Sequence, residues 1–230
     1  MGNIMDYIEW RGDLPFTQSE FNDVDNLILA CFSYVNLDGI QEAASQNGIE
    51  LKALTEKFLQ LHTEKELKED KSFIRFAPFM MLEMAKTERF GQCVIRNYVN
   101  EIVAEEAQQF SAVEICLSDG TSYISFRGTD DTIVGWKEDF NMSFKAPVPS
   151  QLQALDYLEM IAKKKRGKFR IGGHSKGGNI AVYAAAFTGS EIQKRIMQVH
   201  NFDGPGFTKD IIDQMSQGEI SERIRTIVPQ

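Results

Sequence analysis

The stretch GGHSKGGN, residues 172–179, joins an apolar run, FRI at 169–171, to an alanine-rich segment. Within it, Gly173 and Gly177 flank Ser175 in the spacing G-x-S-x-G. In that pattern the serine sits on a sharp turn between a strand and a helix, and a side chain at either flanking position would collide with the neighbouring backbone. The pattern predicts Ser175 as a nucleophile at the end of a strand. A phosphate-binding glycine turn or a plain tight turn is the alternative.

A second stretch, SYISFRGTDD at 122–131, offers another part of such a site. The strand that it predicts ends at Arg127 and is followed by Gly128-Thr129. Acyl transfer needs two hydrogen-bond donors aimed where the tetrahedral oxyanion forms. The backbone N–H of Lys176, directly after the serine, is one candidate donor. The N–H or the hydroxyl of Thr129 is the other.

The residues after this loop predict a structural support for it. Arg127 and Asp139 are opposite charges in an otherwise apolar setting, so we expect a buried ion pair that fixes the loop. Trp136 and Phe140 are four residues apart, which is the spacing of one helix face. We expect both aromatic side chains to face the core.

The order of the predicted elements indicates an α/β fold. Residues 1–90 are mostly helical by their apolar spacing, and residues 91–230 carry the sheet with the serine turn. Strands that alternate with helices imply βαβ units, so we expect one domain with a largely parallel central sheet and flanking helices. The predicted helices are one capped at Asn22 or Asp23 and others at 51–61, 76–84, 148–164, from 176 and at 208–215, and the predicted strands lie within 94–127 and at 168–173, 196–202 and 223–228.

Composition narrows the function classes. The net charge of −8 disfavours a nucleic-acid partner, which needs a basic surface. No apolar run approaches the roughly 18 residues of a membrane span, and the N-terminus lacks the features of a secretory signal, so we expect no stable membrane insertion. Cys31, Cys93 and Cys116 are widely spaced and odd in number, which favours free thiols in a cytoplasmic protein. Metal-ligating residues do not cluster at zinc spacing, so neither a metal nor a cofactor is predicted.

Both stretches together resemble the class 3 lipases, a branch of the α/β-hydrolases, through FRGTD, then W-x-x-D, and later GHS-x-GG. The wider pattern is similar to a bacterial group of lipase-like proteins, and DYIEWRGDLPF and NFDGPGF extend the likeness over essentially the whole chain. The resemblance implies an α/β-hydrolase fold with Ser175 as the nucleophile, and Thr129 with the Lys176 amide as the oxyanion hole. It also implies an acyl ester or lipid substrate, and an Asp and a His later in the chain than the serine.

The general base is not identified by the sequence. A serine nucleophile needs an imidazole within hydrogen-bond reach. His62 is expected at a helix end facing solvent, His174 in a structural role beside the serine, and His200 inside a predicted strand. Asp203 follows that strand, at the edge where α/β sheets bind their ligands. It is either the triad acid or an aspartate that caps a turn.

Two function classes follow from these residues. The first is a serine hydrolase that cleaves a carboxylic ester through an acyl-enzyme on Ser175, and an acyltransferase would use the same intermediate. The alternative is a non-catalytic α/β-hydrolase fold for binding or scaffolding, which would have no need of the serine and its glycines. Lys176 stands where the class 3 lipases have leucine, and a charge beside the pocket favours a polar or anionic substrate. Since the sequence ends at Gln230, before the family's histidine is due, we expect it to be part of a longer protein.

Overall fold

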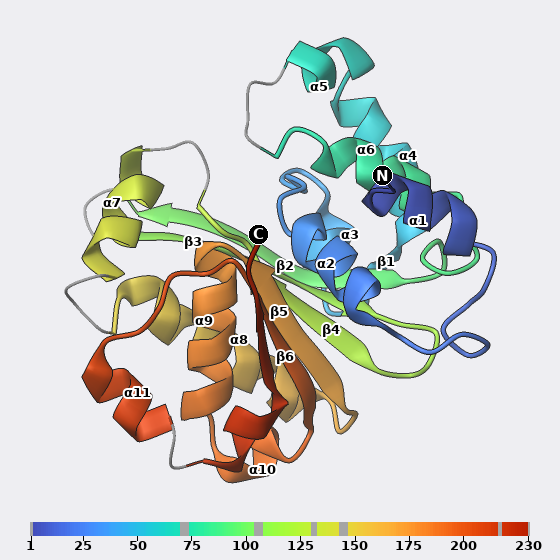
Figure 1. The fold of residues 1–230 in the computed structure, drawn as a ribbon. Helices are drawn as coiled ribbons and strands as arrows, with labels where there is room; N and C mark the ends of the chain where they lie inside the picture. The colour runs from blue at the N-terminus through green and yellow to red at the C-terminus, as the bar shows by residue number, and fades with distance from the viewer. Residues whose placement is uncertain are drawn as a thin grey trace.

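The computed structural model describes residues 2–69, 74–103, 108–129, 133–142, 147–215 and 218–229. A seven-stranded sheet runs through these residues, with helices on both of its faces (Figure 1). The strands follow one another across the sheet in the order of the chain, from β1 to β7. They are β1 (Ile49–Glu50), β2 (Val94–Val103), β3 (Gln108–Cys116), β4 (Ser122–Phe126), β5 (Phe169–His174), β6 (Ile196–Phe202) and β7 (Ile224–Ile227).

The sheet has an antiparallel half and a parallel half. Neighbouring strands from β1 to β4 pair antiparallel, whereas those from β4 to β7 pair parallel. The α/β class predicted from the sequence is confirmed. The parallel strands lie in the C-terminal half, where the helices between them make the crossover connections that parallel pairing requires.

The N-terminal helices pack on one face of the sheet. Their apolar side chains form a core with the antiparallel strands and Tyr123 of β4. Met80, Met81 and Met84 are buried in it, so this methionine-rich stretch packs the core. The helices of this part are α1 (Ile4–Arg11), α2 (Asp23–Phe32), α3 (Gln41–Ala44), α4 (Leu51–Leu61), α5 (Glu64–Glu69) and α6 (Ala77–Ala85).

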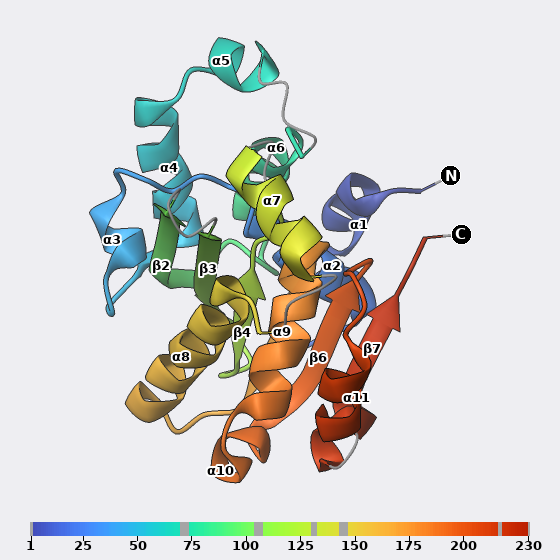
Figure 2. The same ribbon diagram turned by 90° about the vertical axis from the view of Figure 1, so that its left-hand side faces the viewer.

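The opposite face is covered by two longer helices, α8 (Pro149–Lys164) and α9 (Lys176–Phe187), which lie side by side in Figure 2. They belong to a second apolar core with the inner residues of β3 to β6. Strand residues alternate between the two cores, because successive side chains of a strand point to opposite faces. On β3, Val113 faces the N-terminal helices and Ala112 faces the second core.

The remaining elements lie around the parallel half. The helix α7 (Ile133–Met142) follows β4, and α10 (Ser190–Gln193) follows α9. After β6 come α11 (Lys209–Met215) and a 3-10 helix, Glu219–Arg223, which leads into β7. Within the described ranges, none of the helices combines the length and the apolarity needed to cross a bilayer.

Most of the predicted elements are confirmed within a residue or two. Asn22 caps α2 through a capping box, since its side chain accepts from Val24 and Asp25 while the Asp25 carboxylate accepts from the Asn22 N–H. The expectation for Trp136 and Phe140 is wrong. Both side chains lie on α7 and are exposed, at 66% and 67% respectively. Their four-residue spacing does indicate one helix face, but that face points to solvent.

Candidate active site

Ser175 stands at the junction between β5 and α9 in a strained backbone conformation. Its φ is 55° and its ψ is −133°, a region that residues with a side chain rarely adopt. The Ser175 N–H donates to the Phe202 carbonyl of β6 over 2.8 Å, and the Ser175 carbonyl accepts from the Gly178 N–H over 2.9 Å. These bonds fix the turn at the C-terminal edge of the parallel strands. The side chain is half-buried, so the hydroxyl is within reach of a ligand.

The two flanking glycines are required by close backbone contacts. A Cβ added at Gly173 would lie 2.3 Å from the Gly177 carbonyl carbon, and one added at Gly177 would lie 2.2 Å from the Phe126 carbonyl oxygen. Both distances are far shorter than carbon contacts allow. The steric reason for G-x-S-x-G therefore applies at this turn, with the end of β4 as the neighbouring backbone.

The loop after β4 passes directly over the serine. A Cβ added at Gly128 would lie 3.2 Å from the Ser175 Cβ and 2.5 Å from the His174 carbonyl oxygen. Thr129 follows and is half-buried, and its Cγ2 lies 2.7 Å from where a Cβ at Gly135 of α7 would be. The structure thus brings the Gly128-Thr129 segment and Ser175 together, although they are far apart in the sequence.

Lys176 contributes two separate features. It is the first residue of α9, so its N–H is one of the helix N-terminal donors without a partner inside the helix. Its side chain turns away from the serine into the protein, where Nζ donates to Glu138 Oε2 and to the Gln109 carbonyl, both over 2.7 Å. The lysine charge is therefore not beside the pocket. The preference for a polar or anionic substrate that the sequence suggested loses its basis.

Glu138 is the residue that the sequence analysis missed. Its carboxylate is buried on α7 and also accepts from the Gln109 N–H over 3.2 Å and from the Ser150 N–H over 3.0 Å. A buried lysine side chain needs a counter-charge. Lys176, directly after the predicted serine turn, was therefore a sequence signal for an acid nearby.

The Arg127 side chain is buried and donates to Asn100 Oδ1 over 2.9 Å. The expected partner of Arg127, Asp139, has its side chain outside the described part of the structure.

His174 is the last residue of β5 and contacts the N-terminal region. Its Nδ1 lies 3.0 Å from the Tyr34 hydroxyl, which also donates to the His174 carbonyl oxygen over 3.3 Å. Burial lowers the pKa of His174 below its usual value, and the nearby Asp203 carboxylate raises it in part. The neutral ring and its tyrosine contact fit a structural role that holds the end of β5.

His200 lies inside β6 and is fully buried. Its Nε2 lies 3.1 Å from Asp23 Oδ1 and 3.4 Å from Asn26 Nδ2, both on α2. Burial lowers the pKa of His200, against the opposing effect of Asp23. His62 caps the end of α4, where its ring packs against Phe58 at a centroid distance of 4.5 Å. Among the described residues, none of these three rings hydrogen-bonds to the Ser175 hydroxyl.

Asp203 follows β6 on the same edge of the sheet as Ser175. Its φ is 54°, its N–H donates to the Ile227 carbonyl over 2.8 Å, and its side chain is exposed. The following turn is capped by Asn201 instead, whose Oδ1 accepts from the Gly204 N–H over 2.9 Å. The site therefore combines a strained serine, the Lys176 N–H, the Gly128-Thr129 loop and an exposed carboxylate. Such a set of groups suits acyl transfer once a base is present.

Comparison with known proteins gives one family match. A family model described as Mbeg1-like matches residues 84–230, which include β2 to β7 and the serine turn. A search of curated proteins finds no match.

The solved structures that are similar to the chain include the following two. One is the crystal structure of M37 lipase, with 14% sequence identity and a TM-score of 0.49, covering 91% of this chain and 68% of that chain. The other is the Rhizomucor miehei lipase in its propeptide complex, with 17% identity and a TM-score of 0.42, covering 59% of this chain and 49% of that chain. The resemblance to a lipase-like family predicted from the sequence is confirmed by the family match.

Proposed function

The chain belongs to the Mbeg1-like family, and from that premise we propose that it is a serine hydrolase that cleaves a carboxylic ester through an acyl-enzyme on Ser175. One observation carries the proposal. Ser175 has a φ of 55° between two glycines that cannot bear a Cβ, directly beneath the Gly128-Thr129 loop. Strain of this kind costs of the order of 1–3 kcal/mol, and it persists where the surrounding structure enforces it.

The proposed chemistry follows from these positions. The Ser175 oxygen attacks the ester carbonyl carbon while a general base takes its proton, and the carbonyl oxygen becomes an oxyanion. The N–H of Lys176 and the N–H or hydroxyl of Thr129 donate to this oxyanion, and the start of α9 adds a favourable dipole. The C–O bond to the alcohol breaks, and the base returns its proton to the leaving alkoxide. Water then attacks the acyl-enzyme and releases the acid and Ser175.

A histidine is the general base in this proposal, because a serine nucleophile needs an imidazole to take its proton. His200 is enclosed between β6 and α2, and His174 contacts Tyr34. Asp203 is our candidate for the triad acid, because an acid on this edge of the sheet would lie near an imidazole that reaches Ser175. The proposed substrate is an acyl ester or lipid. Free thiols at all three cysteines are compatible with the cytoplasmic location that we propose.

A second candidate is a non-catalytic binding or scaffold protein. The observation that favours it is the absence of an imidazole hydrogen-bonded to Ser175 within the described residues. A fold of this class does not by itself imply activity, since function depends on the site. The two candidates differ in whether the Ser175 hydroxyl is activated.

Intact-mass measurement after incubation with a fluorophosphonate tests the proposal, with Ser175→Ala as the control. A single adduct that is lost in Ser175→Ala supports a serine hydrolase and makes a histidine of this chain, His174 or His200, the base. No adduct on the protein would contradict the proposal and leave the scaffold as the function.

A further inference from the structure

A basic segment stands out in this acidic chain. Residues 163–168, KKKRGK, place five cationic side chains among six residues, while the whole chain has a net charge of −8. The segment forms the last turn of α8 and the connection to β5. Cations in the last turn of a helix complement its dipole. That effect does not account for the cations after the helix, and their surroundings suggest a further role.

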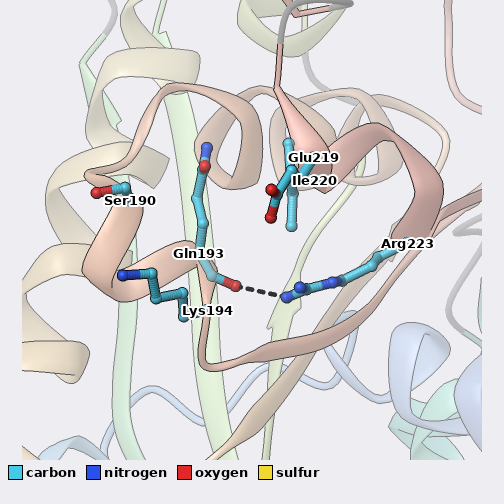
Figure 3. Close-up of a pocket in the computed structure, with 6 residues that line it drawn as sticks. All are labelled: Ser190, Gln193, Lys194, Glu219, Ile220 and Arg223. Atoms are coloured by element: carbon cyan, nitrogen blue, oxygen red, sulfur yellow. Dashed lines mark hydrogen bonds between the residues drawn. The ribbon is translucent and has the colours of Figure 1, made fainter.

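A cavity of about 240 Å³ elsewhere shows what a satisfied cationic site looks like in this protein. It lies between α10 and the 3-10 helix (Figure 3). Arg223 there donates to the carbonyl oxygens of Gln193 and Ile196, both over 2.8 Å, and Lys194 pairs with Glu191. The cations of that cavity already have partners within the chain.

The cavity beside the basic segment is different. It has a volume of about 220 Å³ and lies between the end of α8 and β2. Its lining includes Lys164 and Lys165 at the end of α8, Arg96 and Asn97 of β2, and Glu114 of β3. Three cations and one carboxylate thus face the same space.

The single carboxylate of this cavity is already compensated. Glu114 accepts from Nε and Nη2 of Arg96, both over 2.9 Å, from Asn97 Nδ2 over 2.8 Å and from Ser122 Oγ over 2.8 Å. Lys165 Nζ donates to the neutral Ser122 Oγ over 2.9 Å. No acid pairs with Lys164 or Lys165 among the residues that the structure describes. Their positive charge is therefore available to a ligand, and the walls of a cavity strengthen its field.

The backbone of β2 in the cavity lining is strained and held in place. Asn97 has a φ of 53° at an irregularity in the pairing of β2 with β3. Its N–H donates to the Ser45 carbonyl over 3.1 Å, and its own carbonyl accepts from the Tyr157 hydroxyl over 2.8 Å. Such strain is found where a site is built and the surrounding contacts enforce it. Here it keeps Arg96 and Asn97 in the lining with the two lysines.

We propose that this cavity binds a small phosphate-bearing anion, either inorganic phosphate or a phosphorylated small molecule. Lysine ammonium groups form charge-assisted hydrogen bonds to phosphate oxygens, and the guanidinium edge of Arg96 that faces away from Glu114 adds further donors. The cavity lies before the start of β5, whereas Ser175 follows its end. Six strand residues separate the two by roughly 20 Å. The proposed ligand is soluble, because a membrane presenting an ester to Ser175 would lie at the other edge of the sheet.

Isothermal titration of inorganic phosphate at constant ionic strength, with chloride as the comparison, tests the site. The test variant is Lys164→Gln/Lys165→Gln, and its matched control is Lys163→Gln/Lys168→Gln, which removes the same charge from residues that do not line the cavity. We expect phosphate binding to weaken by about tenfold or more in the test variant and to stay within about twofold in the control. Lys164→Gln alone, at an exposed side chain, separates loss of a ligand contact from loss of folding.

Three outcomes would overturn the proposal. They are no phosphate-dependent heat in the unmodified protein, equal weakening of phosphate binding in both double variants, and a heat that chloride reproduces.

A second experiment mixes the protein with vesicles of neutral phosphatidylcholine, with or without an anionic phosphatidylglycerol fraction. If the protein sediments with the anionic vesicles but does not bind free phosphate, its partner is a membrane surface and not a soluble anion. That result would also contradict the proposal. None of these measurements depends on Ser175.

Discussion

Lys176 and Glu138 form a buried ion pair between the first turn of α9 and the helix α7. Nζ and Oε2 are 2.7 Å apart, and both side chains are only 1% exposed. The pair connects the residue after the proposed nucleophile to the helix that follows the Gly128-Thr129 loop. Because the Gln109 and Ser150 N–H groups also donate to Glu138, four separate elements meet at one carboxylate.

Removing one member of this pair is expected to destabilise the protein strongly. Glu138→Leu leaves the Lys176 ammonium buried without its counter-charge, which costs about 3–5 kcal/mol. The double variant Glu138→Leu/Lys176→Met should recover the part of that loss that comes from the unpaired charge, while the Gln109 and Ser150 N–H groups still lack their acceptor. Urea unfolding followed by circular dichroism measures both free energies. Lys163→Met, which breaks the exposed pair with Glu159, is the control and should change stability by less than about 1 kcal/mol. If Glu138→Leu is as stable as Lys163→Met, the prediction is contradicted.

The glycine at 177 is expected to be irreplaceable. In Gly177→Ala the new methyl would lie 2.2 Å from the Phe126 carbonyl oxygen, so β4 and α9 must move apart. Overpacking of this kind costs about 1–3 kcal/mol. Gly189→Ala is the matched control, since a Cβ there meets nothing within 4 Å. Thermal unfolding of the two variants should show a clear loss for Gly177→Ala and almost none for Gly189→Ala. Equal melting temperatures of the two variants would show that Gly177 does not lie so close to the Phe126 carbonyl oxygen.

Local patterns made the parallel half of the fold predictable. The apolar run before Ser175, the glycines around it and the alanine-rich segment after it each determine one short element. Asn22 likewise gives the start of α2, because capping depends on residues three positions apart. These predictions rest on neighbours in the chain. They succeed where local preference and tertiary packing agree.

The partners of charged residues could not be predicted in this way. Glu138 meets Lys176 across 38 positions of sequence, and Arg127 donates to Asn100 of β2 across 27 positions. Helical spacing also indicates that two residues share a face but not which way the face points. That limit explains the error at Trp136 and Phe140, whose shared face is exposed.

The two tryptophans of the chain offer a direct check on this exposed face. Trp10 is 71% exposed and Trp136 is 66% exposed, so both indoles contact water in the folded protein. Native emission should already be close to that of the unfolded chain, and acrylamide should quench most of it. Trp10→Phe leaves Trp136 as the single reporter. A blue-shifted and poorly quenched spectrum from that variant would mean that α7 buries its aromatic side chains.

Folding stability is expected to fall below about pH 6.5 because of His200 and His174. Burial lowers the pKa of both rings in the folded state, whereas the unfolded chain has ordinary histidine pKa values near 6.5. As the pH falls through that value, the unfolded state takes up protons first, so stability present at neutral pH is progressively lost. Each ring contributes at most about 1.4 kcal/mol per pH unit. Urea unfolding between pH 5 and 8 measures the slope, which should be smaller in His200→Gln than in the unmodified protein. A slope that His200→Gln leaves intact would assign the acid sensitivity to other groups.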